Sequence, residues 1–136
     1  MQTFLPFKDF AKSAAHLDRQ RLGKQRVETY QILRALNGET KGWTNHPATK
    51  MWRGYESALV LYGIAICKEW KMRSYKDNMQ DRIAAYQTSE TPEMPPWLGD
   101  ERLHASHRAN LLRKDGSHYG PNGWTENPAL PYYWPV

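Results

Sequence analysis

Residues 17–28 constrain the fold more than any other segment, because they combine helical spacing with closely spaced charges. At 100° per residue, Arg21, Lys24 and Glu28 share one face of a helix. The apolar residues Leu22, Leu33 and Leu36 cluster on another face. Glu28 is therefore either a solvated partner of Lys24, in a pair that contributes about 0.2–0.5 kcal/mol, or an acid–base group in an anion-binding site. The spacing alone leaves both interpretations open.

The rest of the chain predicts an all-α fold, a single compact domain over residues 1–136 with three to five helices. Asp18 is a suitable N-cap for the long charged helix, and Asn37-Gly38 is a common helix end. From Gly116 onward, Gly, Pro, Asn and aromatic residues predict an irregular aromatic tail packed over the helices. The expected helices cover residues 7–15, 18–37, 55–73, 78–87 and 101–114.

Charge and cysteine content narrow the class of protein. The formal net charge is +5, which favours a polyanionic partner such as DNA or a nucleotide through counterion release. The single cysteine, Cys67, excludes an internal disulfide and suggests a reducing cytoplasm. The apolar stretch 59–67 is too short to span a membrane and is predicted to be a buried helix. We expect a cytoplasmic protein, a monomer, with no membrane partner.

Several residues outside the first helix face are candidates for substrate contacts, and each also has a purely structural interpretation. Asn45 and His46 precede a helical start at Pro47, where helix N-termini gather anions. A histidine that closes the loop is an equal alternative. Neither the histidines nor the carboxylates form a set suited to a metal, so we expect no metal and no cofactor. The candidate substrate-binding residues are Arg19, Arg21, Lys24, Arg26, Asn45, His46, His104, His107, Arg108, Tyr132, Tyr133 and Trp134.

The predicted charged helix carries the pattern Leu17-x-x-Gln20-x-Leu22, with Glu28 eight residues after Gln20. This pattern resembles the first helix of phage members of the pyrimidine-dimer DNA glycosylase family, also called endonuclease V. Three further stretches carry the resemblance: residues 42–47 are similar to a Gly-aromatic-x-Asn-His-Pro block of bacterial cytoplasmic relatives, residues 104–106 to a His-x-Ala-Ser stretch, and residues 130–135 to an aromatic C-terminus.

The resemblance implies a helical fold, with Glu28 as the essential acid–base residue. In this family the nucleophile is the α-amine of the mature N-terminus, which forms an imine with the sugar and permits strand cleavage by elimination. An α-amine, with a pKa of about 8, keeps a useful neutral fraction at neutral pH.

The sequence departs from the family pattern close to these residues. Gln2 is large and should hinder removal of Met1. The Met1 amine would then serve as the nucleophile, displaced by about 3.5 Å. The alternative is that the imine chemistry is absent. Val27 replaces an arginine and Arg21 replaces a histidine, which leaves lesion specificity open. We predict a DNA glycosylase, with or without lyase activity, that removes a damaged or modified base. The alternatives are a nucleotide- or nucleoside-processing enzyme, or a non-catalytic protein that binds nucleic acid or nucleotides.

Overall fold

The computed structural model describes residues 1–136 and contains seven α-helices, one 3₁₀ turn and no β-strand. The all-α prediction is confirmed, but three to five helices was too low, because α3 and α7 form additional single turns of four residues. The helices are α1 (Phe10–His16), α2 (Arg19–Leu36), α3 (Pro47–Lys50), α4 (Glu56–Met72), α5 (Gln80–Ala84), α6 (Glu101–Lys114) and α7 (Gly116–Tyr119), followed by the 3₁₀ turn η1 (Gly120–Asn122).

The boundaries of the charged helix α2 follow from its end residues. A carboxylate oxygen of Asp18 accepts a hydrogen bond from the Arg21 N–H at 3.3 Å, which satisfies one of the free amides of the first turn. At the other end Asn37 is the C-cap, and Gly38 adopts a left-handed conformation with φ of 76° that an L side chain disfavours. The predicted start and end of this helix are confirmed.

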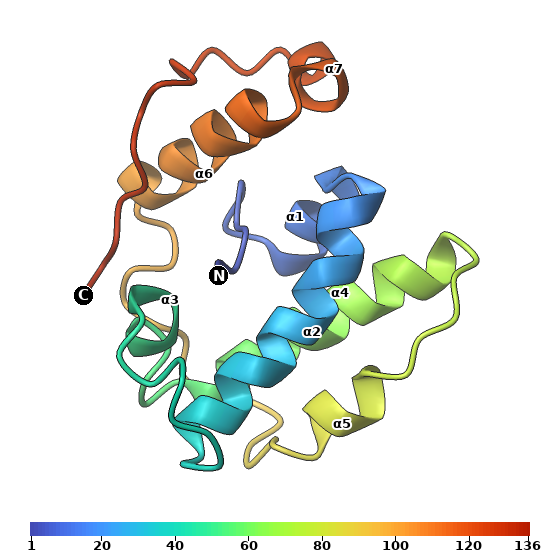
Figure 1. Cartoon of the computed structure of the whole chain (residues 1–136), viewed down its shortest axis with the longest axis vertical. Helices are drawn as coiled ribbons and strands as arrows, with labels where there is room; N and C mark the ends of the chain where they lie inside the picture. The colour runs from blue at the N-terminus through green and yellow to red at the C-terminus, as the bar shows by residue number, and fades with distance from the viewer.

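The core forms where α2 packs against α4, with α1 and α5 also against α4 (Figure 1). Gly63 of α4 permits the close approach, because a Cβ atom there would lie 2.8 Å from the Thr29 side chain and 2.9 Å from that of Ile83. Trp52 and Tyr62 are among the largest fully buried side chains. The predicted burial of the apolar stretch 59–67 is confirmed for most of its length, since six of its nine residues are buried.

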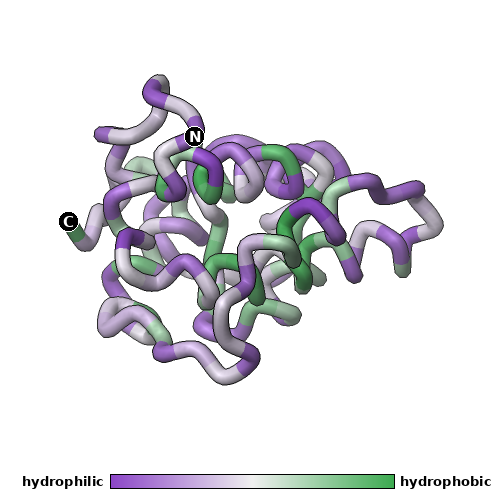
Figure 2. The backbone as a smooth tube through the Cα atoms, turned by 90° about the horizontal axis from the view of Figure 1, so that it is seen from below, coloured by the Kyte–Doolittle hydropathy of each residue, from purple (hydrophilic) through white to green (hydrophobic).

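Helix α6 lies apart from the α2–α4 pair, and the N-terminal segment before α1 runs through the space between α6 and α2 (Figure 1). The C-terminal tail then runs back along α6, where Asn110 donates to the carbonyl of Leu130 and Ser106 accepts from the Tyr133 N–H. In Figure 2 hydrophilic residues mark the outer loops, and hydrophobic stretches mark parts of the helices. This arrangement brings both ends of the chain toward α6.

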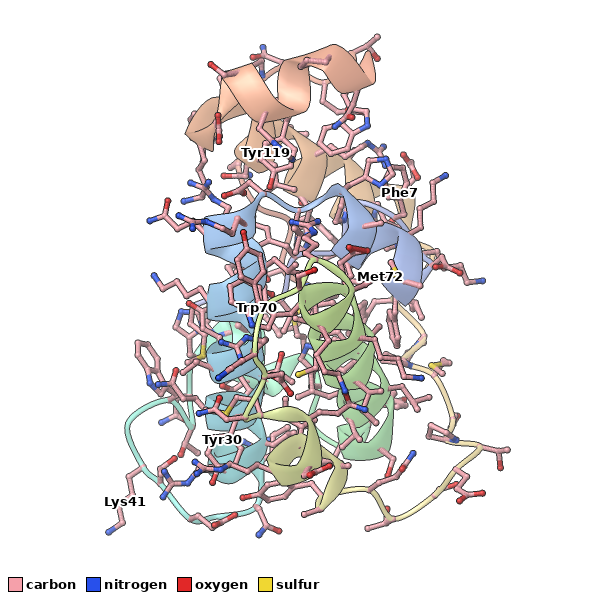
Figure 3. The ribbon with its side chains drawn as sticks, turned by 90° about the vertical axis from the view of Figure 1, so that its right-hand side faces the viewer. Phe7, Tyr30, Lys41, Trp70, Met72 and Tyr119 are labelled. Carbon is pink, nitrogen blue, oxygen red and sulfur yellow. The ribbon has the colours of Figure 1, made fainter.

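The prediction of an irregular tail from Gly116 was wrong for residues 116–122, which form α7 and η1. Asp115 caps α7 by accepting from the His118 N–H at 3.2 Å. The fully buried Tyr119 then anchors the turn, because its hydroxyl lies 2.5 Å from a carboxylate oxygen of Asp18 (Figure 3). A tertiary contact therefore stabilises a helix that is too short to be stable alone.

None of the helices is long and apolar enough to cross a membrane. Cys67 is fully buried in α4, and burial raises the pKa of its thiol to about 12, with the nearby Asp77 carboxylate acting in the same direction.

Candidate active site

A polar cleft of about 260 Å³ opens between the N-terminal segment, the first half of α2 and the end of α6. It contains three cationic side chains and a single carboxylate, that of Glu28, so its charge suits an anionic ligand. Three amide side chains, two aromatic rings and Met1 complete the wall. The lining residues are Met1, Gln2, Phe4, Gln20, Arg21, Lys24, Gln25, Glu28, Lys114 and Tyr132.

The N-terminal segment has no regular secondary structure and is nevertheless buried, because side chains from the helices satisfy its backbone. The Phe4 N–H donates to Oε1 of Gln25 at 2.9 Å, and the Phe4 carbonyl accepts from the hydroxyl of Tyr62 at 2.8 Å. The indole N–H of Trp52 donates to the hydroxyl of Thr3 at 3.0 Å. These contacts hold the start of the chain in one position against α2 and α4.

Two histidines of α6 hold the next residue of the segment. The Leu5 N–H donates to Nδ1 of His107, and the Leu5 carbonyl accepts from Nδ1 of His104, both at 2.8 Å. Nε2 of His104 accepts from the Gly99 N–H at 3.0 Å. Burial lowers the pKa of His107 to about 3, and the neighbouring His104 adds to this shift.

Both histidines were predicted to contact substrate, and the structure instead places them in the core, against the backbone of Leu5. In the structure the two histidines hold the N-terminal segment in place, and neither lines the cleft.

Glu28 meets the start of the chain inside the cleft. Its Oε2 accepts hydrogen bonds from the Gln2 N–H at 3.3 Å and from Nε2 of Gln25 at 3.1 Å. Its Oε1 lies 3.9 Å from Nζ of Lys24, and the Glu28 side chain is 13% exposed. One oxygen is thus held by the protein, and the other lies on the side of Lys24.

His46 approaches the same region from the loop before α3. Its Nδ1 accepts from the Ala48 N–H at 3.0 Å, so the ring caps α3 as the structural interpretation expected. Partial burial lowers the pKa of His46, the positive amine of Met1 lowers it further, and Glu28 acts in the opposite direction. The charges of the chain's amine and of the cleft carboxylate thus act on this imidazole in opposite directions. Asn45 next to it is exposed on the loop.

The three aromatic residues near the end of the tail, at positions 132–134, have different surroundings. Tyr132 lines the cleft, and burial raises its pKa to about 12, with Arg113 and Arg21 acting against this rise and Glu28 adding to it. Trp134 packs edge-to-face on His46, with ring centroids 5.8 Å apart. Tyr133 lies under the guanidinium of Arg102 at 4.6 Å. Only Tyr132 of the three is among the cleft-lining residues.

The remaining predicted cations do not gather in the cleft. Arg108 pairs with Glu101 and with Glu126, and it donates to the carbonyl of Pro6 at 2.8 Å, so it ties α6 to the start of the chain and to the tail.

A second, open groove on the neighbouring side of α2 includes Arg19 and Arg26. Arg26 pairs with Asp77 at 2.7 Å and lies 4.6 Å from the ring of Trp70, which packs against α2 (Figure 3).

Five cleft residues were not among the sequence-predicted candidates. Gln20 and Gln25 lie eight and three positions before Glu28, so the helical spacing that grouped Arg21 and Lys24 with Glu28 would also have found them. Lys114 belongs to the basic last turn of α6, a local signal for a phosphate contact. No local signal marks Gln2 and Phe4, because their position depends on how distant segments pack.

The structure gathers no group of three or more His, Cys, Asp or Glu side chains that could hold a metal ion. The polar groups that meet in the cleft are the amino end of the chain, a carboxylate, three amides and three cations. Such a set is suited to acid–base and amine chemistry on an anionic substrate.

The fold and cleft define a class of small all-helical protein whose own amino end lies beside a glutamate in a basic cleft. The chain belongs to the pyrimidine dimer DNA glycosylase family, whose model matches residues 1–83. The matched part includes the N-terminal segment, α1 to α4 and most of α5, and therefore Met1, His46 and Glu28. The family resemblance seen in the sequence is confirmed. Comparisons with curated proteins and with solved structures gave no match.

Proposed function

We propose that the protein is a DNA glycosylase that removes a damaged or modified base, with Glu28 as its acid–base residue and the Met1 amine as its nucleophile. The observation that carries this proposal is the meeting of the chain's amino end with Glu28 in one cleft. Gln2 and Glu28 are 26 positions apart, yet the Gln2 nitrogen lies 3.3 Å from the carboxylate. Family membership points to pyrimidine dimers as the substrate class.

The proposed reaction begins with the neutral amine attacking C1′ of the damaged nucleotide as the C1′–N bond breaks. The base leaves with the bonding electrons and takes up a proton. The new ammonium loses a proton and the sugar ring opens, which gives an imine at C1′ and a hydroxyl from the ring oxygen. Water then hydrolyses the imine, or removal of a C2′ proton expels the 3′-phosphate and cuts the strand.

Glu28 supports each of these steps as a fixed anion that can accept and return a proton. A positive charge develops at C1′ as the glycosidic bond breaks, and a nearby carboxylate stabilises it. Oε1 of Glu28 is the oxygen available for this role, because Oε2 already accepts two hydrogen bonds.

DNA would be held by the cations around the cleft. Arg21, Lys24 and Lys114 lie on two helices that border it, and each phosphate they neutralise releases condensed counterions. Tyr132 offers a ring on which an extruded or unstacked base could lie. We propose damaged duplex DNA as the partner and the cytoplasm as the location.

One observation favours a second candidate function. Val27, where the family has an arginine, is 37% exposed, so the surface beside Glu28 lacks one of the family's cations. A smaller anion, a nucleotide or nucleoside, would need fewer phosphate contacts, and a protein that only binds nucleic acid or nucleotides would need no nucleophile.

Borohydride trapping tests the nucleophile directly, because hydride reduces an imine to a stable amine. The protein, with its N-terminus determined by mass spectrometry, is incubated with duplexes that carry a cyclobutane pyrimidine dimer, an abasic site or no damage. We expect an adduct at the N-terminal amine that is specific to the dimer duplex. Nucleotide hydrolysis with no adduct and no base release would favour the second function instead.

Substitution of the carboxylate tests its role. Glu28→Gln should lower the rate of base release by about 10²–10⁴-fold, the range that a positioned acid–base group supplies. Glu93→Gln is the matched control, because Glu93 lies exposed on the loop before α6. Full activity of Glu28→Gln would refute the proposed acid–base role.

A further inference from the structure

Gln25 lies at the back of the cleft and is 1% exposed, and both the nitrogen and the oxygen of its amide are hydrogen-bonded. Nε2 donates to the Gln2 carbonyl at 2.9 Å and to Oε2 of Glu28 at 3.1 Å. Oε1 accepts from the Phe4 N–H at 2.9 Å and lies 2.7 Å from the hydroxyl of Tyr62. An amide has two donors and two acceptor lone pairs. Both donors and one lone pair of Gln25 have partners of their own, and the second lone pair shares the single hydroxyl hydrogen of Tyr62 with the Phe4 carbonyl.

The partners of Gln25 belong to three separate parts of the chain. Gln2 and Phe4 lie on the N-terminal segment, Glu28 on the next turn of α2, and Tyr62 on α4. Gln25 therefore fixes the amino end of the chain and the cleft carboxylate relative to each other. Packing alone would not require these bonds, since a leucine or methionine of similar volume would also fill a buried position on α2.

The hydrogen bonds also distinguish the two oxygens of Glu28. Oε2 accepts from Gln25 and from the Gln2 N–H, whereas Oε1 has only the Lys24 ammonium at 3.9 Å. Rotation of the carboxylate would break two bonds inside a largely buried site, and leaving buried donors unpaired is costly.

We propose that Gln25 is a positioning residue that holds Oε2 of Glu28 against the N-terminal segment and so presents Oε1 to the substrate, at a fixed distance from the chain's amine. This role rests on the proposed function, because it concerns the reaction of Glu28 and the amine. Gln25 itself touches no reacting atom.

The test is Gln25→Glu, which keeps the shape of the side chain and its acceptor oxygens but removes the two donors. When the new carboxyl is protonated, its O–H can still donate to Oε2 of Glu28. When it ionises, two carboxylates face each other and repel, which shifts their shared titration by about one unit or more. Gln31→Glu is the matched control, because Gln31 lies on the same helix outside the cleft.

We expect the kcat of Gln25→Glu to fall about tenfold or more at pH 8 and to stay within about threefold of the wild type near pH 5.5. KM should change little, and Gln31→Glu should follow the wild-type profile. A role confined to packing would lower activity by the same factor at every pH. That result, or a wild-type profile for Gln25→Glu, would overturn the proposal.

A second measurement covers the case in which Gln25→Glu does not fold, and it needs no activity. In NMR spectra of the wild-type protein, the side-chain amide of Gln25 should shift with pH, and this shift should disappear in Glu28→Gln. The amide of Gln31 is the internal control. An amide of Gln25 that does not respond to Glu28 would refute the positioning role. Absence of base release by the wild type would instead refute the proposed function.

Discussion

The two ends of the chain both lack regular secondary structure, and they differ in almost every other respect. Residues 2–5 are buried, whereas residues 130–136 are half-buried or exposed. Backbone N–H and C=O groups can be buried only when they are hydrogen-bonded. The N-terminal segment meets this condition through side chains of α2, α4 and α6.

The tail uses fewer such contacts. Asn110 donates a hydrogen bond to the carbonyl of Leu130, and Arg113 donates one to that of Pro128. The hydroxyl of Ser106 accepts one from the Tyr133 N–H. The comparison shows that burial of an irregular segment requires side-chain partners for its backbone: residues 2–5 have them from three helices, and the more exposed tail needs fewer.

The largest expected difference between the two segments is in stability. Leu5 is 0% exposed and Leu130 is 40% exposed. Leu5→Ala should lower the free energy of unfolding by about 2–5 kcal/mol through lost burial and a new cavity. Leu130→Ala should change it by about 0.5 kcal/mol or less. Urea denaturation of the two variants measures both values, and equal effects would contradict the difference in anchoring.

The next largest effect is a pH dependence of the stability, which arises from His107, the residue that accepts a hydrogen bond from the Leu5 N–H. The pKa of His107 is about 3 in the folded protein, against about 6.5 in an unfolded chain. Between these values the unfolded state binds more protons, so stability is complete above pH 6.5 and falls as the pH is lowered toward 3. From pH 7 to pH 4 this group should cost up to about 3 kcal/mol of the free energy of unfolding.

His107→Asn separates this contribution from those of other groups. Asn can still accept from the Leu5 N–H through its short amide, but it does not titrate. We expect urea midpoints of this variant to depend less on pH between 7 and 4 than those of the wild type. The two proteins are compared by the slope of the urea midpoint against pH, and not by the midpoint itself, because the lost ring contacts lower stability at every pH. Equal slopes would exclude His107 as the source.

The smallest expected effect concerns ligand binding by the tail. Tyr132 lines the cleft, whereas Tyr133 packs against Arg102 outside it. If a base stacks on Tyr132, Tyr132→Ala should weaken binding of a dimer-containing duplex by about 1–3 kcal/mol. Tyr133→Ala serves as the matched control and should bind within about twofold of the wild type. Fluorescence anisotropy at one fixed salt concentration measures both, and equal losses would show that the tail acts as a whole.

Sequence reasoning was most accurate where the cause of a structure is local. The Asp18 cap, the end of α2 at Asn37 and the range of α6 were all predicted correctly, because capping side chains and helical spacing act within a few residues. It missed α7, whose stability depends on the contact of Tyr119 with the distant Asp18.

The same limit applies to the candidate site. The face of α2 with Arg21, Lys24 and Glu28 could be predicted because all three lie on one helix. His104 and His107 are three residues apart and share one face of α6, but spacing does not say whether a helix face meets solvent or the core. Only the packing of α6 against the N-terminal segment decided that they hold Leu5.

The sequence by itself determined the all-helical fold, the basic charge and the position of Glu28 on a charged helix face, because each depends on residues near one another in the chain. The tertiary structure alone decided that the amino end of the chain lies beside Glu28 and that Gln25 joins the two. Those contacts depend on an irregular segment being buried between helices, and such a segment has no periodic pattern. Its position follows from the hydrogen-bonding groups that the surrounding helices supply.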